Sequence, residues 1–180
     1  MQIQNAMDAI LQRRSVRKYK PDPITEEQYE AVMQAFDWAP TARNEQEIRA
    51  IVLKDGATLK AFSEDFNAFC QKSGGRVYGN FYYGAPMFIF LVGPKDFPFT
   101  AIDGGITSEN MAIAAQSVGL GSVIIGCLRL FLADEASAAW RERLGIQDTE
   151  VFTVGIALGV PASADQPVPS RKPGKISVVE

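Results

Sequence analysis

The chain has 180 residues, 47% of them hydrophobic and 22% charged, which predicts one globular domain over residues 1–180 and excludes a disordered chain. Its net charge of −3 gives no reason to expect nucleic-acid binding. The longest apolar run, at 85–93, is too short to cross a bilayer, and residues 1–8 lack a signal-peptide pattern, so a cytoplasmic protein without a membrane partner is expected. With no histidine and only two cysteines, His-based triads, the commonest metal sites and disulfide frameworks are excluded. No metal is expected, and any catalysis must rely on a bound organic cofactor.

The first half of the sequence shows three helical patterns and one strand pattern. Thr25 and Gln28 have the spacing of a capping box, in which each side chain bonds the other residue's backbone N–H. A helix is therefore expected to begin there and to end before Pro40. The predicted elements are helices over 6–14, 25–39 and 59–73 and a strand over 49–54.

The second half mixes strands and helices without regular βαβ alternation, which favours an α+β fold. Residues 87–92 are all apolar, so they are expected to form a central strand covered on both faces. The helix predicted over 101–118 is apolar nearly all round, and such a helix needs more cover than a small monomer offers. Strands over 122–125 and 151–158 and a helix capped by Asp134 complete the pattern.

Two polar segments are candidates for ligand binding. Residues 13–17 (Arg-Arg-Ser-Val-Arg) can surround a phosphate with guanidinium groups and a hydroxyl, or they form a solvated basic turn. The loop at 39–46 can offer backbone groups and two polar side chains to a planar ligand, or it is a plain connection. The dinucleotide fingerprint, the Walker A loop and the G-x-S-x-G elbow are all absent from the sequence.

Two further segments stand out in composition. The aromatic residues of 80–86 precede the apolar strand and are more typical of core or rim packing than of a stacking site. A second basic cluster, at 170–173, lies in a polar, proline-rich tail, where an exposed basic tail is the simpler interpretation.

Taken together and in this order, these segments resemble the FMN-dependent nitroreductase superfamily. The matching motifs span most of the chain: Arg-Arg-Ser-Val-Arg at 13–17, Ala-Pro-Thr-x-x-Asn-x-Gln at 39–46, Tyr-Gly-Ala-Pro at 83–86, Gly-Leu-Gly-Ser at 119–122, Ile125-Gly126 and Arg-Lys-Pro at 171–173. The resemblance implies an α+β fold with a mixed, largely antiparallel sheet flanked by helices. It also implies a homodimer, in which the 101–118 helix packs against its partner's copy and an extension at about 162–180 crosses to the partner subunit.

The resemblance further implies bound FMN, with NADH or NADPH as electron donor and no side chain that transfers protons. The implied contacts group by the part of FMN that they meet. At the phosphate they are Arg13, Ser15 and Arg171, with Arg14 or Lys172 in support. At the ring they are Arg17 at the N1/O2 edge, Asn80 at the pyrimidine edge, and Ile124, Ile125 and Gly126 against one face, with the Gly126 N–H near N5. The second subunit contributes Pro40, Thr41, Ala42 and Asn44.

The implied reaction is ping-pong hydride transfer from NAD(P)H through flavin N5 to a nitroaromatic, a quinone or a similar acceptor. The sequence departs from the family pattern at 46–48, where Gln-Glu-Ile replaces Gln-Pro-Trp, and at Arg43, which replaces a small residue. Arg43 is either a determinant for acidic or nitro-bearing acceptors or a surface arginine. Two alternatives stay open. One is a dehalogenating or flavin-consuming branch of the family; the other is a non-enzymatic flavin-binding or storage protein whose pocket is closed by Arg43 and the pair at 82–83.

Overall fold

One four-stranded sheet forms the centre of the protein, seen in a computed structural model that describes residues 5–163 and 167–179. The strand order is β1-β2-β4-β3, and every neighbouring pair is antiparallel. The strands are β1 (Arg49–Leu53), β2 (Met87–Pro94), β3 (Gly121–Ile125) and β4 (Glu150–Gly159).

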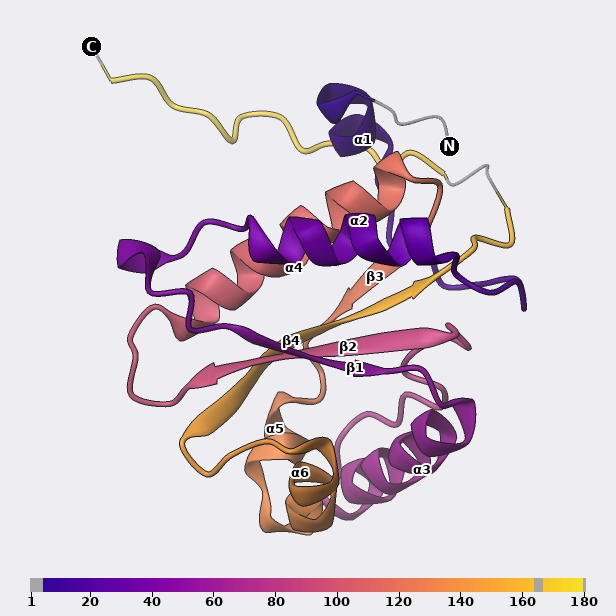
Figure 1. Ribbon diagram of the computed structural model, residues 1–180, viewed down its shortest axis with the longest axis vertical. Helices are drawn as coiled ribbons and strands as arrows, with labels where there is room; N and C mark the ends of the chain where they lie inside the picture. Colours follow the sequence, from indigo (N-terminus) through magenta and orange to yellow (C-terminus); the bar gives the residue numbers. More distant parts are fainter. Residues whose placement is uncertain (1–4, 164–166, 180) are drawn as a thin grey trace.

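Helices cover both faces of this sheet (Figure 1). On one face lie α1 (Ala6–Gln12), α2 (Glu26–Asp37) and α4 (Thr100–Ser117), with α1 outermost. On the other face lie α3 (Gly56–Lys72), α5 (Arg129–Ala133) and α6 (Ala138–Leu144). The predicted α+β fold, an antiparallel sheet flanked by helices, is confirmed.

Strand β2 contributes to two hydrophobic cores because its side chains alternate between the faces of the sheet. Phe88 and Phe90 are fully buried in the core that includes residues of α3, α5 and α6, where Phe62 lies 5.4 Å from Phe90 in an edge-to-face contact. Ile89 and Leu91 are fully buried in the core that includes residues of α2 and α4. The prediction of a central strand covered on both faces is therefore confirmed.

Local sequence signals predicted most of the helix ends. The Gln28 N–H donates to Thr25 Oγ1 and the Thr25 N–H donates to Gln28 Oε1, so the capping box is formed in full. The Asp134 side chain accepts a hydrogen bond from the Ala136 N–H, but it caps a short 3-10 turn before α6 and not α6 itself. The preceding helix α5 is absent from the sequence prediction.

Helix α4 packs closely on the sheet along one side and is exposed along another. Gly104 permits the close approach, because a Cβ at this position would collide with the Thr153 side chain of β4. On the outer side, Ile102 and Ile106 are 56% and 40% exposed. The sequence predicted that this apolar helix would be buried on nearly all sides, but a single chain leaves its outer side exposed to water. No helix in the described part of the chain is long and apolar enough to span a membrane.

Candidate functional site

The arginine-rich segment, residues 13–17, is fixed against the edge strand β3. Ser15 pairs with Ser122 in a parallel bridge, and the Val16 N–H donates to the Ser122 carbonyl with an N···O distance of 2.8 Å. Gly121 makes room for the segment, because a Cβ there would lie 2.7 Å from Val16 Cγ2. The backbone that carries the three arginines is thus tied to the sheet.

Two of these arginines have buried Nε donors that lack an acceptor in hydrogen-bond orientation, although one of them forms an ion pair. Arg13 Nε lies 2.9 Å from Glu109 Oε1, close enough for an ion pair. Arg14 Nη1 donates to the carbonyls of Leu11 and Arg13 at 2.8 and 2.7 Å. The Nε atoms of both arginines are nevertheless buried without a properly oriented hydrogen-bond acceptor among residues 5–163 and 167–179. Such orphaned donors are uncommon in native proteins, and the oxygens of a phosphate would satisfy them.

The third arginine joins this segment to the turn that precedes β2. Arg17 Nη1 donates to the Ser15 carbonyl at 3.1 Å, and Arg17 Cζ lies 5.7 Å from the centre of the Tyr83 ring. Tyr19 anchors the backbone just beyond, since its hydroxyl donates to the Val16 carbonyl at 2.9 Å. Burial raises the pKa of Tyr19 well above its usual range, so this hydroxyl keeps its proton at neutral pH.

The structure places the predicted ring contacts at the end of β3 and in the turn before β2. Ile124 is partly buried, and Ile125 is buried in the core next to α3. Gly126 is exposed, with no atom near the position of a Cβ. Asn80 is also exposed and lines a polar cavity of about 390 Å³ whose other walls include Ser63 of α3. Within one chain, Asn80 therefore borders a cavity whose opposite wall is formed by α3.

The loop at 39–46 has an unusual backbone. Arg43, Asn44 and Gln46 have φ angles of 57°, 56° and 53°, although none is glycine. This left-handed conformation costs about 1–2 kcal/mol for a residue such as Arg43 or Gln46 and less for Asn44, because asparagine adopts it more readily. Within the loop, the Gln46 N–H donates to Thr41 Oγ1 at 3.0 Å, and the Gln46 amide donates to Asn44 Oδ1 at 3.2 Å. A conformation with this cost requires support from its surroundings.

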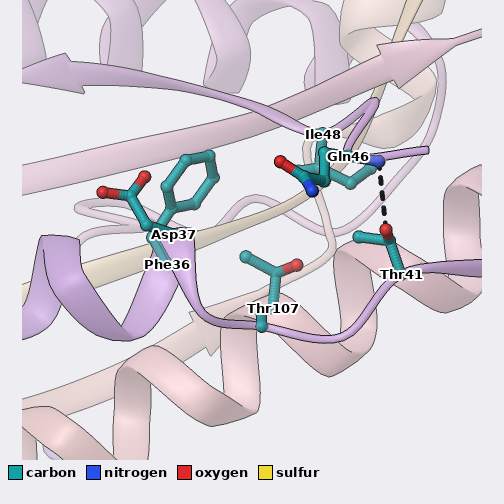
Figure 2. Close-up of a pocket in the computed structure, with 7 residues that line it drawn as sticks. Phe36, Asp37, Thr41, Gln46, Ile48 and Thr107 are labelled. Atoms are coloured by element: carbon teal, nitrogen blue, oxygen red, sulfur yellow. Dashed lines mark hydrogen bonds between the residues drawn. The ribbon is translucent and has the colours of Figure 1, made fainter. Parts of the chain in front are cut away.

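That support comes from a buried carboxylate on α4. Asp103 is only 2% exposed, and its two oxygens lie 3.1 and 3.2 Å from the Ala42 nitrogen, whose N–H they share. Beside this contact lies a cavity of about 120 Å³ between α2, α4 and the loop (Figure 2). Its wall is made of Phe36, Asp37, Ala39, Thr41, Gln46, Ile48 and Thr107. Figure 2 shows Thr41 and Gln46 joined by their hydrogen bond at one side of this cavity.

Within one chain, the arginine-rich segment contacts the middle of α4 and the strand beyond its end, whereas this loop is bound at the start of the helix. The Ala42 N–H bonds Asp103 in the first turn of α4. Arg13 pairs with Glu109, six residues and about 9 Å further along the helix, and Ser15 pairs with Ser122 beyond its end. Among residues 5–163 and 167–179, no hydrogen bond or ion pair joins the predicted contacts at Pro40, Thr41, Ala42 and Asn44 to the three arginines.

The remaining predicted contacts lie in the C-terminal tail. Arg171 and Lys172 are exposed and belong to a stretch, 167–179, without helix or strand. Figure 1 shows this tail running away from the body of the protein to the chain end. Residues 164–166 and 180 of the predicted extension lie outside the described residues. No cluster of three or more histidine, cysteine, aspartate or glutamate side chains suited to a metal ion occurs in the described ranges.

Comparison with known proteins identifies the family. The sequence model of the Nitroreductase family matches residues 10–160. The chain belongs to this family. It is similar to an NADPH-flavin oxidoreductase of Vibrio harveyi, with 29% identity over 98% of this chain and 73% of that protein.

Two solved structures of family members have the same fold. A nitroreductase of Bacteroides fragilis, crystallised with bound FMN, superposes with a TM-score of 0.88 and 24% identity, over 98% of this chain and 100% of that one. An FMN-dependent nitroreductase of Clostridium difficile superposes with a TM-score of 0.83 and 27% identity, over 97% and 98% of the two chains.

Four residues near these segments were missed by the sequence prediction. Tyr19 and Glu109 contact the arginine-rich segment, and Asp103 holds the loop. Tyr83 was expected in core or rim packing or as a residue closing a pocket, and its contact with Arg17 was not predicted. Of the four, only Asp103 gave a sequence signal, as the one charged side chain in the first half of an otherwise apolar helix.

Proposed function

We propose that the protein is an FMN-dependent NAD(P)H oxidoreductase that reduces small acceptors such as nitroaromatics or quinones. The observation that carries this proposal is the pair of buried Nε donors of Arg13 and Arg14, which lack an oriented hydrogen-bond acceptor and directly precede Ser15 in the chain. A phosphomonoester offers a dianion with three strong acceptor oxygens, which suits these donors. Two findings support the choice of FMN. The chain belongs to the nitroreductase family, and the two similar solved structures are a nitroreductase with bound FMN and an FMN-dependent nitroreductase.

In this proposal, FMN contacts two subunits of a homodimer. Arg13, Ser15 and Arg171 hold the phosphate, with Arg14 or Lys172 in support. Pro40, Thr41, Ala42 and Asn44, in the loop bound to the first turn of α4, then contact the flavin from the second subunit. The exposed isoleucines on the outer side of α4 support such a pairing, because a single chain leaves them in contact with water.

The chain's own residues bind and orient the cofactor. When bound, FMN supplies the redox chemistry, accepting hydride at N5 from NADH or NADPH and delivering it to the acceptor in a separate, ping-pong half-reaction. Arg17 places a fixed positive charge at the N1/O2 edge, where negative charge develops on reduction. Gly126, Ile124 and Ile125 at the end of β3 would contact the flavin ring, with the Gly126 N–H toward N5, and Asn80 would bind the pyrimidine edge. None of these contacts requires a side chain to transfer a proton, which is compatible with a chain that has no histidine.

An anaerobic reduction experiment tests the proposal. The purified protein, loaded with FMN, is mixed with NADH or NADPH in the absence of oxygen, and the visible absorption of the flavin is followed. We expect bleaching with at least one nucleotide and recovery of colour when a nitroaromatic or a quinone is added. FMN that stays oxidised with both nucleotides would refute the oxidoreductase and favour a flavin-storage protein. Release of halide from a halogenated phenol would instead indicate the dehalogenating branch.

A further inference from the structure

Asp103 is a buried carboxylate whose partner is the candidate flavin loop. It is 2% exposed, and in residues 5–163 and 167–179 no lysine or arginine forms an ion pair with it. Its position in the first turn of α4 stabilises negative charge through the helix dipole. In the described ranges, its oxygens accept one hydrogen bond, which they share, from the Ala42 N–H. Burial of a carboxylate is costly unless donors compensate for the lost water, so this contact is a specific one.

The loop depends on this contact for its attachment to the helix. Asn44 donates to the Thr41 carbonyl and Gln46 to the Thr41 hydroxyl, but both bonds lie within the loop. In the described part of the chain, the bond from Ala42 to Asp103 is the only hydrogen bond that joins residues 40–46 to another helix or strand. The left-handed residues at 43, 44 and 46 follow directly after this point. The Asp103 carboxylate therefore holds Ala42, the residue directly before the left-handed part of the loop, against α4.

We propose that Asp103 is a positioning residue that sets the flavin-binding loop. This inference rests on the proposed function, because the loop matters to the flavin only if residues 40–44 contact it. Asp103 acts through Ala42 and forms no ion pair with the arginines at 13–17, of which Arg13 pairs with Glu109 six residues further along α4. It should therefore affect the flavin ring and not the phosphate.

Affinities for FMN and for riboflavin, which lacks the phosphate, separate these two parts of the site. Asp103→Ala should weaken both ligands by the same factor, about tenfold to a hundredfold, the range of one charge-assisted hydrogen bond. Asp103→Asn keeps a carbonyl oxygen for the Ala42 N–H and should restore most of the affinity. Asp65→Ala is the matched control, since Asp65 is a helix carboxylate that accepts a bond from Trp140 on the opposite face of the sheet. Unchanged affinity of Asp103→Ala, or a loss confined to FMN, would overturn the proposal.

Two measurements on the loop itself do not depend on flavin binding. Arg43 is exposed, so trypsin should cut after it faster in Asp103→Ala than in the wild type or in Asp65→Ala. In the wild-type protein, hydrogen exchange of the Ala42 N–H should be slower than that of the Arg43 N–H, even if the alanine variant fails to fold. Equal exchange, or equal cleavage, would show that Asp103 does not hold the loop. Wild-type protein that binds neither flavin would refute the proposed function, whereas the loop measurements would still decide the role of Asp103.

Discussion

Replacement of Arg13 by alanine tests the phosphate site most directly. Its Nε is buried without an oriented acceptor and lies 2.9 Å from Glu109. A hydrogen bond between charged groups contributes about 1.5–3 kcal/mol, which corresponds to a tenfold to hundredfold change in Kd. The Arg13–Glu109 pair is 27% and 44% exposed, and a pair of this kind contributes less than about 1 kcal/mol. Competition from Glu109 therefore offsets only part of the bond to phosphate, and Arg13→Ala should raise the Kd for FMN about tenfold or more.

The assay is a titration of the flavin-free protein with FMN, followed by quenching of flavin fluorescence. Riboflavin should bind Arg13→Ala as well as it binds the wild type, because it has no phosphate. Arg76→Ala is the control, since this arginine lies over the Tyr78 ring, 5.4 Å from its centre. The double variant with Arg13→Ala and Arg171→Ala should have a higher Kd for FMN than Arg13→Ala alone. An unchanged Kd for FMN, or an equal loss for riboflavin, would refute the assignment of Arg13 to the phosphate.

Three other predictions concern the ring edge, the packing of α4 and the response to acid. Arg17→Ala should retain FMN but make its reduction potential more negative, because a positive charge is lost; an unchanged potential would remove Arg17 from the ring edge. Gly104→Val should destabilise the fold by about 1–3 kcal/mol in chemical denaturation, since its side chain meets Thr153; a wild-type midpoint would contradict this packing. The hydrogen bond from Arg49 lowers the pKa of Glu150 in the folded state. The pair therefore stabilises the fold above the unfolded-state pKa of a glutamate, about 4.3. This stabilisation is lost as the pH falls through the lower pKa of the folded state. Glu150→Gln should therefore be less stable than the wild type at neutral pH, with a difference that shrinks in acid; a constant difference would argue against the ion pair.

The parts of the fold that the sequence predicted depend on local patterns. The capping box at Thr25 and Gln28 needs only neighbouring residues, and it forms as expected. The run at 87–92 is apolar at every position, which suits a strand between two layers of helices, and β2 occupies that place. The segment order that resembled nitroreductases is matched by the family model over residues 10–160.

The parts that the sequence did not predict depend on contacts between distant segments. The left-handed backbone at Arg43 and Gln46 has no glycine that would predict it, and the neighbouring Ala42 is bound to Asp103, 61 residues away along the chain. Helix α5 has five residues, too few to show a helical period. The roles of Arg171 and of the residues at 40–44 at a shared flavin site stay predictions, since one chain does not bring them to the arginines.

The two tryptophans of the chain occupy contrasting surroundings and so form a built-in pair of optical probes. Trp140 is 8% exposed and packs 5.1 Å from Phe62, so its emission reports the folding of the aromatic layer. Trp38 is 79% exposed at the end of α2, directly before the loop at 39–46, so its emission would respond to a change in its exposure at this loop. Two variants that each keep one tryptophan, followed in separate stopped-flow traces, would distinguish the formation of the interior from the ordering of the loop.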